Sequence, residues 1–184
     1  MKIAYSHLVA HIKENPSIEE ISESLFQLGH EHEIEGTLFD IEFTPNRGDC
    51  LSLFGLARDL GTFYTISEPL TYYEDDLAPL EIDFVNHSVN DCPNISFLTI
   101  EVDEVPNAYK DYLESYYSTF KINKNNFFTD ISNYIAYEMG QPTHCYDNAL
   151  INGSIEFSSD NINKDFETLL GKTIKLEGTN CIFS

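Results

Sequence analysis

Apolar residues recur at helical spacing in three stretches of the first 70 residues. Residues 6–13 form the first predicted helix. A second helix is predicted to begin at Ser17, because Glu20 three residues later completes a capping box, and to end at Gly29. Two apolar stripes mark the buried faces of the second helix and of a third: Ile18, Ile21, Leu25 and Leu28, then Leu53, Leu56, Ala57 and Leu60.

The same part of the chain contains one β-rich run. Residues 37–46 carry Leu38, Ile41 and Phe43 and end in Pro45 and Asn46, which predicts a single strand. We therefore expect a small, mainly helical domain with one strand over residues 1–70. An acidic stretch without periodicity, residues 71–80, is interpreted as a linker.

A different pattern follows over residues 81–184. Strands are predicted at 80–86, 95–105, 154–159 and 173–178, and helices at 108–120 and from 130 onward. In residues 95–105, Phe97, Thr99 and Glu101 alternate with Leu98, Ile100 and Val102. These elements predict an α+β fold with a second, mixed domain. The closing residues 181–184 resemble the start of a strand, from which we expect the fold to continue.

Composition narrows the possible functions. Ten Lys+Arg against 31 Asp+Glu give the 184 residues a formal charge of −21, which opposes autonomous binding of nucleic acid. The four cysteines are irregularly spaced, so no zinc site is expected, and free thiols fit a reducing cytoplasm. His30 and His32 could bind a metal, but they follow a helix end, where histidine complements the helix dipole. No apolar span approaches 18 residues, so no membrane segment is expected.

Residues 130–147, DISNYIAYEMGQPTHCYD, read as a helix with an abrupt end. A continuous helix would place Asn133 and His144 on one face about 16 Å apart along the axis. Gly140 and Pro142 break the helix, so the chain can turn back and bring His144 towards Asn133. The alternative is structural: Gly140 as C-cap, Pro142 as stop and His144 as a packing residue.

The TPNRGDC turn, residues 44–50, also has a structural interpretation. Asn46 and Asp49 can cap the third helix, and Arg47 can pair with an acid across the domain boundary. Cys50 is not expected to be catalytic, because no motif places a histidine near it. The helix predicted at 108–120 carries aromatic residues that could stack on nucleic-acid bases. Their helical spacing favours a buried core face instead: Tyr109, Tyr112, Tyr116 and Phe120.

Three stretches resemble, in order, the β subunit of bacterial-type phenylalanyl-tRNA synthetases. They are KIAYSHLVAHI with LGHEHE, then FDIEFTPNRGDCLSLFGLARDL, then NNFFTDISNYIAYEMGQPTHCYD. The resemblance covers most of the chain and is weakest in the linker and the last thirty or so residues. It implies the amino-terminal part of a β subunit with the start of its editing domain. The family's inserted tRNA-binding OB domain is missing, since HEHEIEG joins its flanks directly.

The resemblance also implies roles for individual residues. His144 and Asn133 match editing-pocket positions, which serve to hydrolyse tyrosine esterified to phenylalanine tRNA. Gln141 and Thr143 beside them are taken as substrate-binding, and no metal is expected. The structural residues are Asn46, Arg47, Asp49, Gly140 and Pro142. A carboxylate and small residues that complete the family pocket have no match here, so the chain alone is not expected to edit efficiently.

The implied partners are the α subunit and, only within the assembly, tRNA(Phe). ATP and Mg²⁺ would act in the full synthetase, and this chain would hold no cofactor. Two alternatives stay open at this point: a non-catalytic interaction module degenerate from the family, and a free-standing trans-editing hydrolase.

Overall fold

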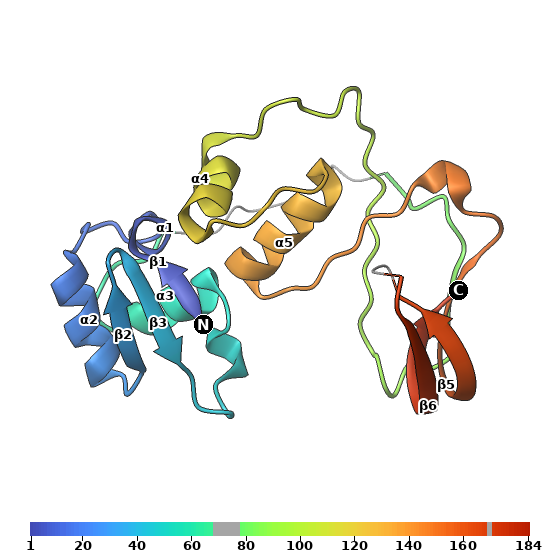
Figure 1. Ribbon diagram of the computed structural model, residues 1–184, viewed down its shortest axis with the longest axis horizontal. Helices are drawn as coiled ribbons and strands as arrows, with labels where there is room; N and C mark the ends of the chain where they lie inside the picture. The colour runs from blue at the N-terminus through green and yellow to red at the C-terminus, as the bar shows by residue number, and fades with distance from the viewer. Residues whose placement is uncertain (68–77, 169–170) are drawn as a thin grey trace. The chain divides into compact units, whose positions relative to one another are not determined.

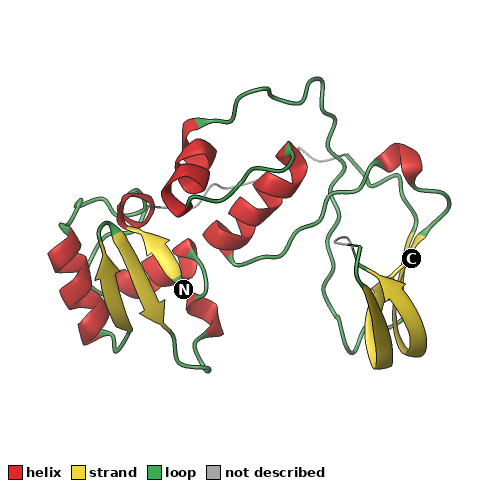
Figure 2. Ribbon diagram, in the orientation of Figure 1, coloured by secondary structure: helices red, strands yellow, loops and turns green. Residues whose placement is uncertain are grey.

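The computed structural model describes residues 1–67, 78–168 and 171–184. These residues fall into two compact units, and each unit contains a three-stranded sheet (Figure 1, Figure 2). The first combines Met1–Thr71 with Glu104–Cys145, and the second combines Tyr72–Asp103 with Tyr146–Ser184. The mixture of helices and sheets confirms the α+β class. Of the linker expected at 71–80, residues 71–77 lie outside the described residues.

The first unit contains a three-stranded antiparallel sheet, so the expectation of one strand was wrong. Strand β3, Leu38–Glu42, is central, with β1, Lys2–Ala4, on one side and β2, Glu31–Glu35, on the other. Phe39 of β3 lies opposite Ile3 of β1 and Ile34 of β2. A tight turn at Gly36, with φ of 66°, joins β2 directly to β3. The two flanking strands are short or charged, so their sequences carried little strand signal.

Three helices pack with this sheet (Figure 1). Helix α1, Tyr5–Val9, is shorter than expected, and α2, Ile18–Gln27, has the predicted capping box between Ser17 and Glu20. Helix α3, Leu53–Leu60, is capped by Ser52 and not by Asp49, because Gly48–Cys50 forms a separate 3-10 turn. The predicted stripe of α3 is confirmed: Leu53, Leu56, Ala57 and Leu60 are all fully buried.

Helices α4, Asp111–Phe120, and α5, Phe127–Met139, also belong to the first unit. The core runs from the sheet through Leu113, Tyr116 and Tyr137. The Tyr137 hydroxyl accepts a hydrogen bond from the Ala4 backbone N–H at 3.3 Å and lies 3.2 Å from His7 Nδ1. The compact units thus differ from the expected division into 1–70 and 81–184. The aromatic side of α4 is a core face as predicted, although Tyr117 is buried there while Tyr112 is 46% exposed.

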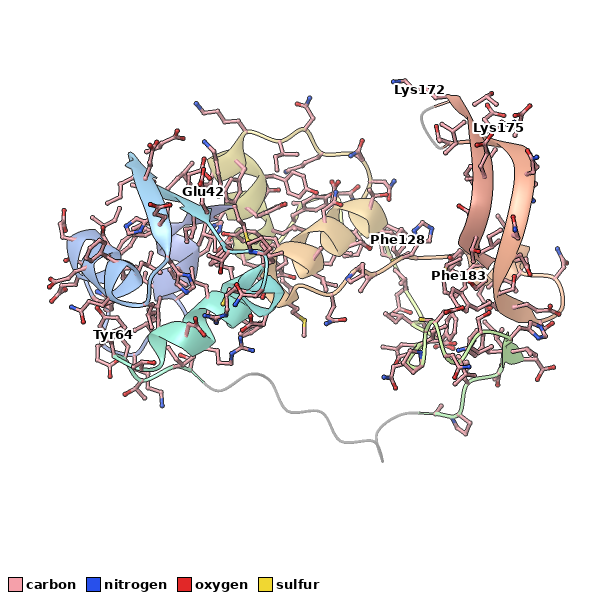
Figure 3. All side chains as sticks on the ribbon, turned by 90° about the horizontal axis from the view of Figure 1, so that it is seen from below. Glu42, Tyr64, Phe128, Lys172, Lys175 and Phe183 are labelled. Atoms are coloured by element: carbon pink, nitrogen blue, oxygen red, sulfur yellow. The ribbon has the colours of Figure 1, made fainter. Side chains whose placement is uncertain are left out.

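The second unit is built on a sheet of order β4-β5-β6. Strand β4, Phe84–Asn86, runs parallel to β5, Ile155–Glu167, which pairs antiparallel with β6, Thr173–Phe183. Figure 3 shows Lys172 and Lys175 at one end of this hairpin and Phe183 at the other. Residues 181–183 therefore end β6 and do not begin a further strand. The strand expected at 95–105 is absent from the described structure, where these residues form no regular element.

None of the helices in the described parts is long and apolar enough to span a membrane.

Candidate functional site

Helix α5 begins around a buried carboxylate. The Asn126 side chain accepts a hydrogen bond from the Thr129 N–H, and Asp130 lies one residue further along. Asp130 is completely buried and accepts hydrogen bonds from the Tyr109 hydroxyl at 2.7 Å and the Asn125 backbone N–H at 3.0 Å. A carboxylate is favourable here, because the first turn of a helix presents unpaired N–H groups and a positive dipole end. The bond to Asp130 raises the pKa of Tyr109 to about 12.

Asn133 lies one turn further along α5 and is exposed. The hydroxyl of Tyr117 on α4 donates a hydrogen bond at 3.3 Å to the backbone carbonyl of Asp130, three residues before Asn133. Burial is the main cause that raises the pKa of Tyr117 to about 12. Helix α4 is thus held against the turn of α5 that precedes Asn133, and Asn133 itself faces solvent.

The end of α5 is fixed against α3. Gly140 ends the helix in the left-handed conformation with φ of 73°, and its N–H donates to the Ala136 carbonyl at 3.0 Å. A Cβ at this position would lie 3.2 Å from Ser52 Cβ, tighter than most real contacts. Both the backbone conformation and the neighbour therefore favour glycine.

After Gly140 the chain returns along α5 (Figure 1). Cys145 Sγ lies 3.7 Å from Ser132 Oγ and 3.9 Å from the carbonyl oxygen of Phe128, which Figure 3 labels near the start of the helix. The segment that bears Gln141, Thr143 and His144 is exposed. The turn-back expected of the helix breakers is present, and it brings Cys145, the residue after His144, to Ser132, the residue before Asn133. Direct cooperation of His144 with Asn133 stays a prediction.

A surface groove of about 870 Å³ joins the two sequence motifs within the first unit. The Thr-Pro-Asn-Arg turn and α3 contribute Asp49, Leu51 and Arg58, and the end of α5 contributes Met139, Gly140 and Gln141. The structure therefore brings Asp49 and Gln141 to one groove, which the sequence did not predict. The groove has charged, amide and apolar walls, as ligand-binding clefts often do.

Arg47 pairs within its own unit, so the pairing expected across the domain boundary is wrong. Its Nη2 atom donates to Asp59 Oδ2 at 2.6 Å and to Cys50 Sγ at 2.8 Å, and its Nε donates to Asp49 Oδ1 at 3.0 Å. Asp49 also pairs with Arg58. Asp49 thus orders its turn through ion pairs and does not cap α3. Asn46, the other expected cap, is exposed.

His30 joins this cluster from the end of α2, although no motif predicted a histidine near Cys50. His30 Nε2 lies 3.0 Å from Asp59 Oδ2, and Cys50 Sγ lies 3.5 Å from the same oxygen. Burial raises the pKa of the Cys50 thiol to about 12, so the thiol stays protonated and is a poor nucleophile.

The ligand atoms of His30, Cys50 and Asp59 lie within 4.8 Å of one another, close enough to hold a metal ion. Arg47 Nη2 contacts two of these three atoms and already supplies the positive charge. A metal would have to displace the guanidinium and deprotonate Cys50. We therefore interpret the cluster as an ion-pair network that fixes the Thr-Pro-Asn-Arg turn to α2 and α3.

Comparisons with known proteins show similarity to one protein in particular, the β subunit of phenylalanine–tRNA ligase. The family model of the B3/4 domain matches residues 99–184. A phenylalanine–tRNA ligase β subunit from Aromatoleum aromaticum is 30% identical over 128 residues, which cover 66% of this chain and 16% of that protein. The one from Pseudoalteromonas translucida is 27% identical over 157 residues, 82% of this chain and 19% of that protein.

The chain is related to the phenylalanine–tRNA ligase β subunit. It spans about a fifth of the length of the β subunits it matches. A solved amino-terminal fragment of the phenylalanyl-tRNA synthetase β subunit from Pyrococcus horikoshii aligns with a TM-score of 0.41 and 18% identity, over 95% of this chain and 50% of that one.

Asp130 is one of the residues of this β-subunit-like region whose role was not predicted from the sequence. A signal was present: Asp130 is an acid on the face of α5 that also carries Phe127, Ile131 and Tyr134, and it follows a capping asparagine. An acid on an apolar helix face near the helix start indicates a buried, hydrogen-bonded carboxylate.

Proposed function

We propose that this chain acts as a β-type component of phenylalanine–tRNA ligase. The observation that carries the proposal is the similarity to β subunits over 157 residues, together with the joint packing of both family motifs in one unit. The chain would support aminoacylation of tRNA(Phe) as part of an assembly in the cytoplasm, where translation takes place.

The charge of the chain makes the assembly necessary. With 10 basic and 31 acidic residues, the chain lacks the cations that would neutralise tRNA phosphates. A more basic α subunit would supply that surface, and ATP and Mg²⁺ would act there. Within this proposal the chain itself needs no cofactor.

The chain would also carry part of an editing pocket. Asn133 and His144 would act on mischarged tyrosyl-tRNA(Phe), with Gln141 and Thr143 contacting the substrate. The support is the return of the chain along α5, which brings Cys145, the residue after His144, to Ser132 and Phe128 of that helix. His144 is nevertheless exposed, and water screens the electrostatic stabilisation that ester hydrolysis requires. The isolated chain would therefore hydrolyse the ester poorly.

A second candidate is a non-catalytic interaction module. The observation that favours it is the exposed, unpaired apolar segment at residues 95–103 of the second unit. In this alternative the family motifs stabilise the fold, and the chain serves to bind other proteins.

Release of tyrosine from tyrosyl-tRNA(Phe) by the purified chain tests the editing part. We expect no release above the uncatalysed rate from the chain alone, and measurable release once the chain is joined with its α subunit. His144→Ala should abolish that release, whereas His87→Ala, at an exposed site in the other unit, should leave it intact. Rapid release by the isolated chain, lost in His144→Ala, would instead establish a free-standing hydrolase.

A further inference from the structure

Residues 95–103 have the side-chain pattern of a β-strand but no strand partner. Leu98, Ile100 and Val102 alternate with Phe97 and more polar residues. Within the described ranges, no backbone hydrogen bond links residues 95–103 to another segment, and Figure 2 draws them as a loop. An extended segment with free N–H and C=O groups can accept an added strand.

One side of this segment is anchored on the second unit. The Phe97 ring lies 4.8 Å from the Phe84 ring and 6.5 Å from the Phe183 ring, and Phe183 in turn lies 4.9 Å from Phe157. These contacts join the segment to the side chains of β4, β5 and β6. They leave the segment positioned before any partner binds, which lowers the entropic cost of binding.

The other side is an uncovered apolar row. Leu98, Ile100 and Val102 are 62%, 69% and 44% exposed. Such side chains at alternate positions normally lie against neighbouring residues in a sheet. Their exposure beside an unpaired backbone distinguishes the segment from a solvated loop, whose side chains are usually polar.

The charge around the row indicates the chemistry of the partner. Residues 80–109 include six Asp or Glu residues and no Lys or Arg. Two copies of the chain, each with a net charge of −21, would repel each other on approach. A strand that alternates apolar and basic residues would match both the apolar row and the surrounding acids.

We propose that residues 95–103 form a docking strand, which binds a partner segment by β-strand addition. The partner segment has apolar side chains in alternation with lysine or arginine. This inference does not depend on a role in aminoacylation, and its test uses no tRNA, so its failure would leave the proposed function untouched.

The test measures binding of a nine-residue peptide in which valine alternates with lysine to the full chain by calorimetry. Three matched peptides serve as controls: one with glutamate in place of lysine, one with the same residues in blocks, and one with alternate backbone nitrogens methylated. We expect the alternating lysine peptide to bind at least about tenfold more tightly than each control, because only it offers pattern, charge and backbone donors together.

Two variants of the chain distinguish binding through the apolar row from electrostatic attraction between the acidic chain and the basic peptide. Ile100→Glu adds negative charge but interrupts the apolar row, and Val89→Glu adds the same charge at another exposed site in the unit. We expect Ile100→Glu to weaken binding of the lysine peptide about tenfold or more, and Val89→Glu to leave it unchanged or slightly tighter. Circular dichroism of both variants should match the parent chain, because neither side chain is buried.

Several results would overturn the inference. One is the absence of lysine-peptide binding up to about 1 mM. Equal binding of the blocked or methylated peptide would show attraction by charge alone. A chain that dimerises in sedimentation, and becomes monomeric in Ile100→Glu, would show that a second copy covers the row.

Discussion

Gly140 and Ser52 lie in direct contact and join the ends of two helices. A Cβ on Gly140 would lie 3.2 Å from Ser52 Cβ and 3.4 Å from Ser52 Oγ, while that oxygen accepts the Gly55 N–H at 2.9 Å. The helix stop that the sequence showed at Gly140 is therefore also a packing contact. It fixes the start of the returning segment relative to α3.

Gly140→Ala should consequently destabilise the first unit. Alanine would adopt a left-handed conformation and also press on Ser52, and together these should cost about 2 kcal/mol or more of unfolding free energy. Urea denaturation measures the effect. Gly36→Ala is the control, because Gly36 has a similar φ of 66° with nothing within 4 Å of an added Cβ. It should cost only about 1 kcal/mol, and an equal loss in both variants would contradict the role of Ser52.

Asp130→Asn should be more damaging than Tyr109→Phe. The amide would place a donor opposite the Asn125 N–H or the Tyr109 hydroxyl, so we expect a loss of about 2–3 kcal/mol. Tyr109→Phe removes one of these bonds and should cost about 1 kcal/mol. Spectroscopic titration adds an independent measurement: in Asp130→Asn the pKa of Tyr109 should fall from about 12 towards its ordinary value of 10. A pKa that stayed near 12 would mean that another group holds the phenol neutral.

The free energy of unfolding should fall as the pH is lowered through 6.5, the ordinary pKa of histidine. Burial lowers the pKa of His7 and of His11 below the usual 6.5, and Glu138 near His11 offsets this only in part. The unfolded chain therefore binds more protons than the folded chain just below pH 6.5, so the free energy of unfolding decreases there and is fully retained above it. Urea midpoints against pH measure the slope. His7→Gln should flatten it, and an unchanged slope would exclude His7 as a cause.

The cysteines should differ in reactivity. Cys50 is buried with a raised pKa, whereas Cys145 and Cys181 are exposed. Iodoacetamide at neutral pH, followed by mass spectrometry, should modify the two exposed thiols well before Cys50. Arg47→Ala removes the cation that touches the Cys50 sulfur and should loosen the cluster, which would make Cys50 accessible. Early labelling of Cys50 in the parent chain would contradict the described burial.

Local signals in the sequence were sufficient for the helices but not for the sheets. The pair Ser17 and Glu20 specifies its own cap, and the stripe of α3 specifies its buried face. Strands β1 and β2 exist because β3 lies between them, which is a tertiary relationship that EHEIE does not reveal. Residues 95–105 failed in the opposite direction: their alternation is that of a strand, but the described chain offers no partner to pair with.

The candidate site was predictable to a similar degree. Gly140 and Pro142 predict a turn after α5, and this turn allows Cys145 to return to Ser132. The convergence of Asp49 and Gln141 on one groove was not predictable, because it depends on the packing of α3 against α5. Asp59 and His30 were missed for the same reason, since no local pattern links them to Arg47.

The native mass of the protein purified from its own cells tests the central claim most directly. If the chain is a component of phenylalanine–tRNA ligase, it should elute in a complex far heavier than its own 21.0 kDa, and mass spectrometry should identify the α subunit in that complex. Elution at the mass of the free chain, with no α subunit bound, would contradict the account.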